Sequence, residues 1–190
     1  GGKHQYFELL LKLSKDPHTI CRAINPKTKL LSDFLRLLIE NEDLPLPLSV
    51  LDKLSVDSKI SRTHKNMLLL TQWHLDCLSS NKPSYSKLTK YLNNLEEKDS
   101  KLSDFLGKMI KSITKRYGMY NPFILALSRK RLSCLPNATL WNRNERAAVH
   151  LEHAIILNAQ GFYSKSYKNG KTKAVVWDAK MIAMKPEKMF

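Results

Sequence analysis

Residues 103–117, SDFLGKMIKSITKRY, decide the fold class that we expect for this chain. Their apolar side chains recur at intervals of three and four, which places them on one side of a helix. The lysines recur at the same intervals on the other side: Lys108, Lys111 and Lys115. Ser103 offers an N-cap for this helix, and Gly118 is a suitable residue to follow its end. The stretch therefore predicts an amphipathic helix with one buried face and one basic face.

The same periodicity recurs along most of the chain, and stretches with turn chemistry separate the segments. Asn121-Pro122 is typical of a helix start, with proline at the first helical position. Asn142, with Glu145 three residues later, resembles a capping box and predicts the start of another helix. We expect helices over residues 4–14, 17–23, 32–39, 49–54, 62–78, 88–95, 104–117, 122–132 and 142–159.

One short sequence occurs twice. Leu31-Ser32-Asp33-Phe34-Leu35 returns as Leu102-Ser103-Asp104-Phe105-Leu106. The repeat favours either duplicated helical hairpins or two helices that share a serine cap followed by a core pair. The flanking residues do not match, which favours the shared cap.

The helical spacing of apolar residues is lost near the C-terminus, where the sequence predicts strands. Asn169-Gly170 is a strong hairpin signal, because both residues tolerate the positive backbone angles of a type I′ turn. A two-residue turn there pairs Lys168 with Lys171, Tyr167 with Thr172 and Tyr163 with Val176. The expected fold class is therefore mainly α, a multi-helix bundle or irregular helical array that ends in a β-hairpin. The polar stretch 79–84 predicts a boundary between a helical lobe (1–80) and a basic lobe that ends in the hairpin (81–190), although both lobes could form one continuous domain.

Positive charge is concentrated in the second half of the chain. Residues 1–95 carry a net charge of +5 (14 basic and 9 acidic residues), and residues 96–190 carry +10 (18 basic and 8 acidic). No acidic residue lies between Asp104 and Glu145, whereas eight basic residues do. Such a field attracts polyanions, and nucleic acid is the commonest of them. Lysine outnumbers arginine 24 to 8, which favours contact with phosphates over the reading of bases.

Other function classes have weaker support. No apolar run reaches the roughly 18 residues that a membrane helix needs. Three cysteines without paired spacing indicate a reducing, intracellular compartment, either nucleus or cytoplasm. The pairs His150/His153 and His74/Cys77 have helical spacing, but no second pair completes a zinc motif. No catalytic or phosphate-binding motif is present, so we expect binding rather than catalysis, with no cofactor, no metal and no catalytic residue.

These observations predict a nucleic-acid-binding domain that contacts mainly the phosphate backbone, has little sequence specificity and prefers RNA or single strands. The alternative is a helical protein-interaction module whose basic face docks an acidic protein or a membrane surface. Lysines that neutralise phosphates and tyrosines that stack on bases are the ingredients of single-strand binding. The candidate binding residues are Lys108, Lys111, Lys115, Arg116, Arg129, Lys130, Arg131, Tyr163, Lys165, Tyr167, Lys168, Lys171 and Lys173.

Overall fold

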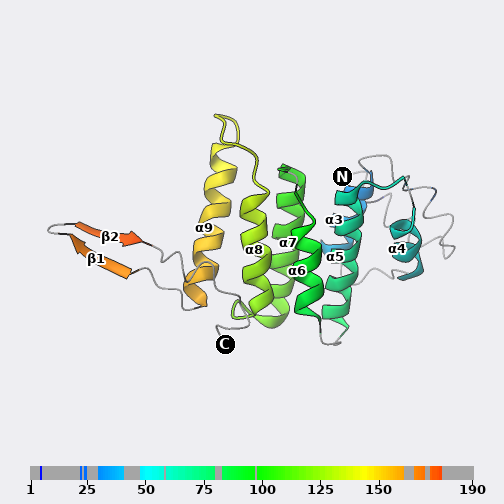
Figure 1. Cartoon of the computed structure of the whole chain (residues 1–190), viewed down its shortest axis with the longest axis horizontal. Coiled ribbons are helices and arrows are strands. Elements are labelled where there is room, and N and C mark those ends of the chain that lie inside the picture. The colour runs from blue at the N-terminus through cyan, green and yellow to red at the C-terminus, as the bar shows by residue number, and fades with distance from the viewer. Residues whose placement is uncertain are drawn as a thin grey trace.

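The computed structural model describes residues 30–40, 48–57, 59–79, 83–96 and 98–160, the single residues 5, 22 and 24, and the backbone of 165–169 and 172–176. The helices expected over 4–14 and 17–23 therefore fall almost wholly outside the described residues. Within residues 30–160 the described chain forms seven helices (Figure 1): α3 (Leu30–Glu40), α4 (Leu48–Ser55), α5 (Arg62–Leu78), α6 (Tyr85–Asn93), α7 (Ser100–Tyr117), α8 (Pro122–Ser133) and α9 (Arg143–Ala159). None of the described helices combines the length and apolar character needed to cross a lipid bilayer.

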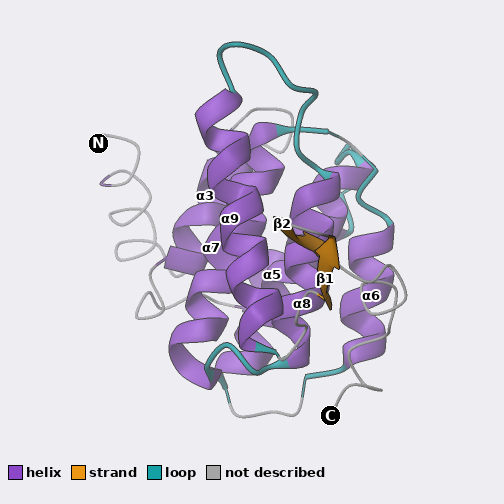
Figure 2. Cartoon of the chain, turned by 90° about the vertical axis from the view of Figure 1, so that its left-hand side faces the viewer, coloured by secondary structure: helices purple, strands orange, loops and turns teal. Residues whose placement is uncertain are grey.

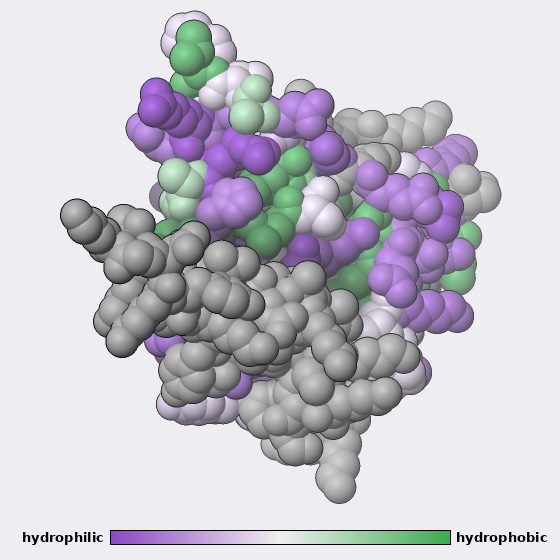
Figure 3. Space-filling model, turned by 60° about the vertical axis from the view of Figure 1, so that its left-hand side comes forward, coloured by the Kyte–Doolittle hydropathy of each residue, from purple (hydrophilic) through white to green (hydrophobic). Residues whose placement is uncertain are grey.

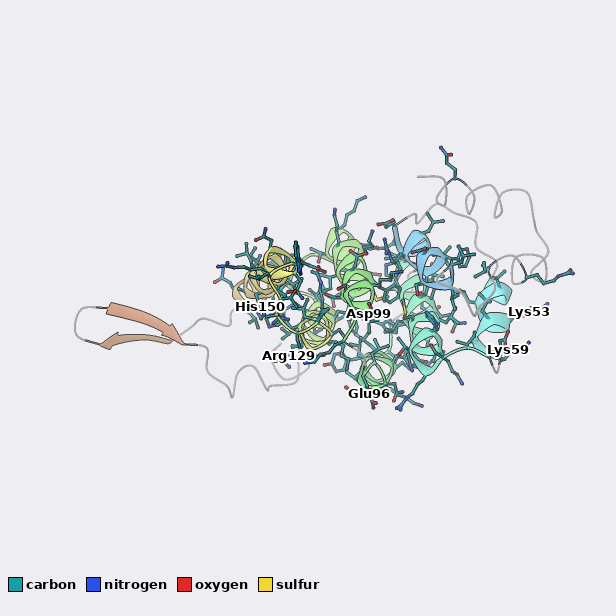
Figure 4. All side chains as sticks on the ribbon, turned by 90° about the horizontal axis from the view of Figure 1, so that it is seen from above. Lys53, Lys59, Glu96, Asp99, Arg129 and His150 are labelled. Atoms are coloured by element: carbon teal, nitrogen blue, oxygen red, sulfur yellow. The ribbon has the colours of Figure 1, made fainter. Side chains whose placement is uncertain are left out.

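The helices stand side by side in two rows. Seen from above (Figure 4), α3 and α7 form one row and α5, α6 and α8 form the other, with α9 at one end and α4 at the opposite end. Figure 2 shows the same order, with α3 and α7 on one side of α9 and α8 and α6 on the other. Helix α7 packs against α3 in its own row and against α8 and α5 in the other. It is therefore the helix that ties the two rows together.

A single apolar core lies between the rows. Phe34 on α3 and Phe105 on α7 are fully buried within it. Trp73 on α5 meets Phe123 on α8 edge-on, with ring centroids 5.3 Å apart, and its indole N–H donates to the carbonyl of Ser84 at 3.1 Å. The same cluster of buried residues includes side chains from both sides of residue 80. The division of the chain into lobes at that residue stays a prediction.

Local capping explains several helix starts. Ser61 accepts from the backbone N–H of His64 at 3.1 Å to begin α5, and Asn121 accepts from that of Phe123 at 2.9 Å to begin α8. The prediction of a helix start at Asn121-Pro122 is confirmed. Asn142 does precede α9, but its side chain makes no capping hydrogen bond. The capping-box interpretation is wrong because this amide binds the preceding loop instead.

The two copies of the repeated sequence do not act as helix starts. Helix α7 begins at Ser100 after Asp99, whose carboxylate accepts from the backbone N–H of Lys101 at 2.9 Å. Ser32 and Ser103 are both buried inside their helices. The predicted serine caps are therefore wrong. The repeat reflects burial instead, because the leucines and phenylalanines of both copies lie in the core where α3 packs on α7.

The expected fold class needs a correction at its C-terminal end. Residues 30–160 contain helices and no strand where they are described, so the fold is a helical array and not an array completed by a hairpin. Beyond it, the backbone of β1 (Lys165–Asn169) pairs antiparallel with β2 (Thr172–Val176). A two-stranded ribbon is marginally stable by itself, so a local turn signal does not make it part of the fold.

The predicted register of this ribbon is also wrong. Asn169 lies opposite Thr172, and Lys168 lies opposite Lys173 instead of Lys171. The connection therefore falls on residues 170 and 171, one position later than expected. β1 has polar residues on both of its faces, and such a strand specifies its register weakly, so turn chemistry predicts a tight turn without fixing where it closes.

Candidate nucleic-acid interface

The outward face of α7 carries the first group of predicted binding residues. Lys108, Lys111 and Lys115 follow one another at intervals of three and four, so they form one ridge along the helix. Lys111 and Lys115 are exposed, and neither forms an ion pair with a described residue. Lys108 is half-buried and pairs with Glu40 of α3. Burial, with Arg36 and Lys111 close by, lowers the pKa of Lys108. Two of the three lysines are thus open to an anionic ligand.

The three consecutive cations of α8 point to different places. Arg131 lies against α7, where its guanidinium donates to the carbonyl of Ser103 at 3.2 Å and pairs with Glu152 of α9. Gly107 leaves room for it, since a Cβ there would lie 2.6 Å from the guanidinium carbon. Because its charge is already matched, Arg131 contributes little to the attraction of a phosphate.

Arg129 and Lys130 line a different surface. They belong to a pocket of about 260 Å³ between α6 and α8, together with Tyr85, Thr89 and Ser133. Figure 4 places Arg129 in the row of α8 and α6, away from α7. Burial lowers the pKa of Arg129. The candidate binding residues of α7 and those of α8 therefore do not form one patch, because Arg129 and Lys130 lie in the pocket beside α6.

A groove of about 600 Å³ separates α7 from α9 and passes over Arg131. Lys108, Lys111 and Lys115 line its α7 side. Ile155 and Ile156 line its α9 side, and Ile155 is 48% exposed. Asp104 of α7 and Glu152 of α9 also line this groove, so its lining combines basic, acidic and apolar side chains.

The C-terminal end of α7 adds aromatic residues that our sequence analysis missed. Arg116 is exposed at this end, and Tyr117 follows it with 42% of its surface exposed. The Tyr117 hydroxyl donates to the carbonyl of Cys77, which holds the ring in place. Tyr120, in the turn before α8, is 70% exposed. The sequence does carry a signal for this cluster, because Lys115, Arg116, Tyr117 and Tyr120 surround Gly118. Gly118 ends the helix with a φ of +78°.

The predicted binding residues near the C-terminus are only partly placed. Tyr163 and Lys171 lie outside the described residues. For the other four residues the structure describes only the backbone. Three of them, Lys165, Tyr167 and Lys168, belong to β1, and Lys173 belongs to β2. Their contribution to binding stays a prediction.

The histidine pairs singled out in the sequence have structural partners. His74 is fully buried and lies 2.8 Å from the Ser112 hydroxyl through its Nε2 atom. His153 lies 2.8 Å from the Ser128 hydroxyl through Nδ1, and burial, with Arg129 and His150 nearby, lowers its pKa to about 4. Over the described ranges, no group of three His, Cys, Asp or Glu side chains could hold a metal ion.

Comparison with family models, with curated proteins and with solved structures found no match to this chain. The surface of the molecule therefore has to support any functional proposal.

Proposed function

We propose that this protein binds nucleic acid through the outward face and the C-terminal end of α7, contacting mainly the phosphate backbone and preferring single strands. The observation that carries the proposal is the set of exposed cations Lys111, Lys115 and Arg116 with the exposed ring of Tyr120, which follows Arg116 by four residues in the chain. Cations that track phosphates next to rings that stack on bases are the two components of single-strand binding. The acidic side chains nearby, Glu40 and Glu152, are paired with Lys108 and Arg131, which leaves Lys111, Lys115 and Arg116 without an ion pair to a described residue.

The shape of the site limits the size of the contact. Lys111 and Lys115 are four residues apart on the helix, a rise of about 6 Å, so both can contact the backbone of one strand that runs along α7. Three cations can therefore neutralise about three phosphates. For single strands the logarithm of the association constant should then fall with the logarithm of salt concentration with a slope of about −2.

The free thiols of Cys77 and Cys134 support placing this activity inside the cell. Both side chains are buried and unbridged, and burial raises the pKa of Cys77 to about 12, which keeps the thiol protonated and unreactive. A reducing compartment, nucleus or cytoplasm, suits such residues.

Fluorescence anisotropy of labelled oligouridylate, oligothymidylate and duplex DNA tests the proposal. The variant K111E/K115E/R116E should weaken single-strand binding at least thirtyfold, because three attractive contacts become repulsive. Its matched control is K59E/K87E/K90E, which changes the net charge by the same amount at three other exposed lysines. Figure 4 shows Lys59 at the end of the array opposite α9.

The fold-loss of affinity in the control variant should be less than a third of the fold-loss in the α7 variant. Equal loss in both variants would mean that binding follows net charge and has no site on α7. No measurable binding of the unchanged protein at about 50 mM salt would reject nucleic acid as the ligand, because electrostatic binding is strongest at low salt.

A further inference from the structure

The loop between α8 and α9 presents two large apolar side chains to solvent. Trp141 is 97% exposed and Leu140 is 86% exposed. Most of the other large apolar side chains in the described part of the chain are buried in the core. An exposed apolar residue alone is ordinary, but a tryptophan and a leucine next to each other at full exposure are not, and such pairs mark interaction sites.

The loop holds these side chains out instead of letting them collapse onto the body. The Asn142 amide accepts from the backbone N–H of Thr139 at 2.8 Å and donates to the carbonyl of Asn137 at 2.9 Å. The Arg146 guanidinium donates to the carbonyl of Pro136. Below the tip, Leu135 is buried and anchors the start of the loop. Because both flanks are fixed by hydrogen bonds, the exposure of the tip belongs to the fold.

The tip is convex. Figure 2 shows the loop between α8 and α9 rising beyond the ends of the helices, and Figure 3 shows hydrophobic atoms in the uppermost projection of that face. Leu140 and Trp141 belong to this projecting loop, so they lie where a flat surface can reach them.

Basic residues outnumber acidic ones near the tip. Lys98 donates to the Asn137 side chain at 3.1 Å, which places its ammonium group beside the loop, and Arg143 is exposed two residues after Trp141. Over residues 98–101 and 134–146 the chain has four basic residues, Lys98, Lys101, Arg143 and Arg146, against two acidic ones, Asp99 and Glu145. A surface that binds this tip should therefore carry negative charge on its outside and an apolar layer below that charge.

We propose that the chain binds peripherally to anionic lipid membranes by inserting Leu140 and Trp141 into the headgroup region. Tryptophan favours the membrane interface, and nearby lysine and arginine are attracted to acidic headgroups. A lipid surface accepts a projecting tip without a matching pocket, whereas a protein partner would have to supply one. Nucleic acid offers stacking to Trp141 but nothing to Leu140. This proposal does not depend on the binding of nucleic acid by α7.

Vesicle sedimentation provides the first test. The unchanged protein should partition onto phosphatidylcholine vesicles that contain about 40% phosphatidylserine, and much less onto pure phosphatidylcholine. The variant L140S/W141S keeps the charge of the protein, so a loss of at least tenfold in partitioning would come from insertion alone. Val56, which is 81% exposed between α4 and α5, gives the matched control V56S, and this variant should bind like the unchanged protein.

Tryptophan fluorescence shows whether the tip enters the bilayer. In a W177F background the two remaining tryptophans are Trp141 and Trp73, and Trp73 is only 3% exposed. Lipids brominated on their acyl chains should quench the emission of this protein, and adding W141F should abolish the quenching. The variant K111E/K115E/R116E should retain the quenching, which separates this proposal from the binding of nucleic acid.

Binding to anionic vesicles that survives L140S/W141S would overturn the proposal, because charge alone would then explain the attraction. Emission that brominated chains leave unquenched would overturn it as well. Absence of binding to either vesicle would do the same, and would point to a pocket of a protein partner as the receptor of the tip.

Discussion

Lys108 and Arg131 show how the fold removes individual charges from a basic sequence. Both lie in the interval from 105 to 144 that has no acidic residue. The fold brings Glu40 to Lys108 and Glu152 to Arg131 from outside this interval. Each ion pair neutralises a cation that the sequence had predicted to be free to bind a phosphate. Residue by residue, therefore, the binding surface is smaller than the number of its lysines and arginines indicates.

His153 carries a prediction about pH. Its pKa is lowered to about 4, chiefly by burial and also by Arg129 and His150, so the folded protein keeps this ring neutral. As the pH falls from about 6.5 to about 4, the unfolded chain takes up a proton that the folded chain refuses. This difference removes stability on acidification. Because the ring is only partly buried, solvent screening should limit the loss to about 1 to 2 kcal/mol.

Urea unfolding at pH 7.5 and at pH 5 measures this loss. In His153→Asn the amide oxygen can keep the hydrogen bond to Ser128 without titrating. The drop in unfolding free energy between the two pH values should be about 1 kcal/mol smaller in this variant than in the unchanged protein. An identical drop would show that His153 does not carry the acid sensitivity.

At the scale of the element, helix α7 combines structural roles with the proposed binding surface. Its inner face fills the core, its outer face carries the basic ridge, and its two ends hold Asp99 and the pair Tyr117 and Tyr120. The helix starts four residues earlier than the serine cap predicted. The added residues extend α7 towards the end of the array where the loop before α9 lies, since the backbone N–H of Asp99 donates to the carbonyl of Cys134 at 3.0 Å.

The two candidate caps of α7 respond differently to alanine. Asp99→Ala should lower the unfolding free energy by about 1 kcal/mol, because the N–H of Lys101 loses its side-chain acceptor. Ser103→Ala should be neutral or stabilising, since the hydroxyl is buried and has no hydrogen-bond partner in the described part of the chain. Chemical denaturation of both variants checks this. A larger cost for Ser103→Ala than for Asp99→Ala would restore Ser103 as the cap.

At the scale of the whole molecule, the contact between α3 and α7 is one of those that join the first half of the described chain to the second. Arg36 of α3 lies 3.3 Å from a carboxylate oxygen of Asp104 on α7, and the two buried phenylalanines of the repeated sequence lie on these same helices. The core therefore couples the first half of the chain to the second. It also keeps the basic ridge of α7 and the apolar tip before α9 in fixed positions on one body, although they serve different proposed ligands.

Coupling through the core predicts cooperative unfolding. Phe34→Leu should lower the unfolding free energy by about 1 to 2 kcal/mol, because it shortens a fully buried side chain. Hydrogen exchange should then speed up by a similar factor in α5 and in α8, which lie on opposite sides of residue 80. Exchange that speeds up in α5 but not in α8 would show two lobes that open independently, as the division at residue 80 predicts.

The sequence by itself determined the helical class, most helix positions and the basic ridge of α7, because the spacing of apolar and charged residues along a helix depends only on neighbouring residues. Only the tertiary structure decided which cations form ion pairs, and it paired Lys108 and Arg131. It also decided that Arg129 and Lys130 line a pocket between α6 and α8, away from α7. It also decided that Trp141, unlike Trp73, remains outside the core. The physical reason is the same in each case. Ion pairing and burial depend on residues far apart in the chain, and no local pattern specifies where packing will bring them.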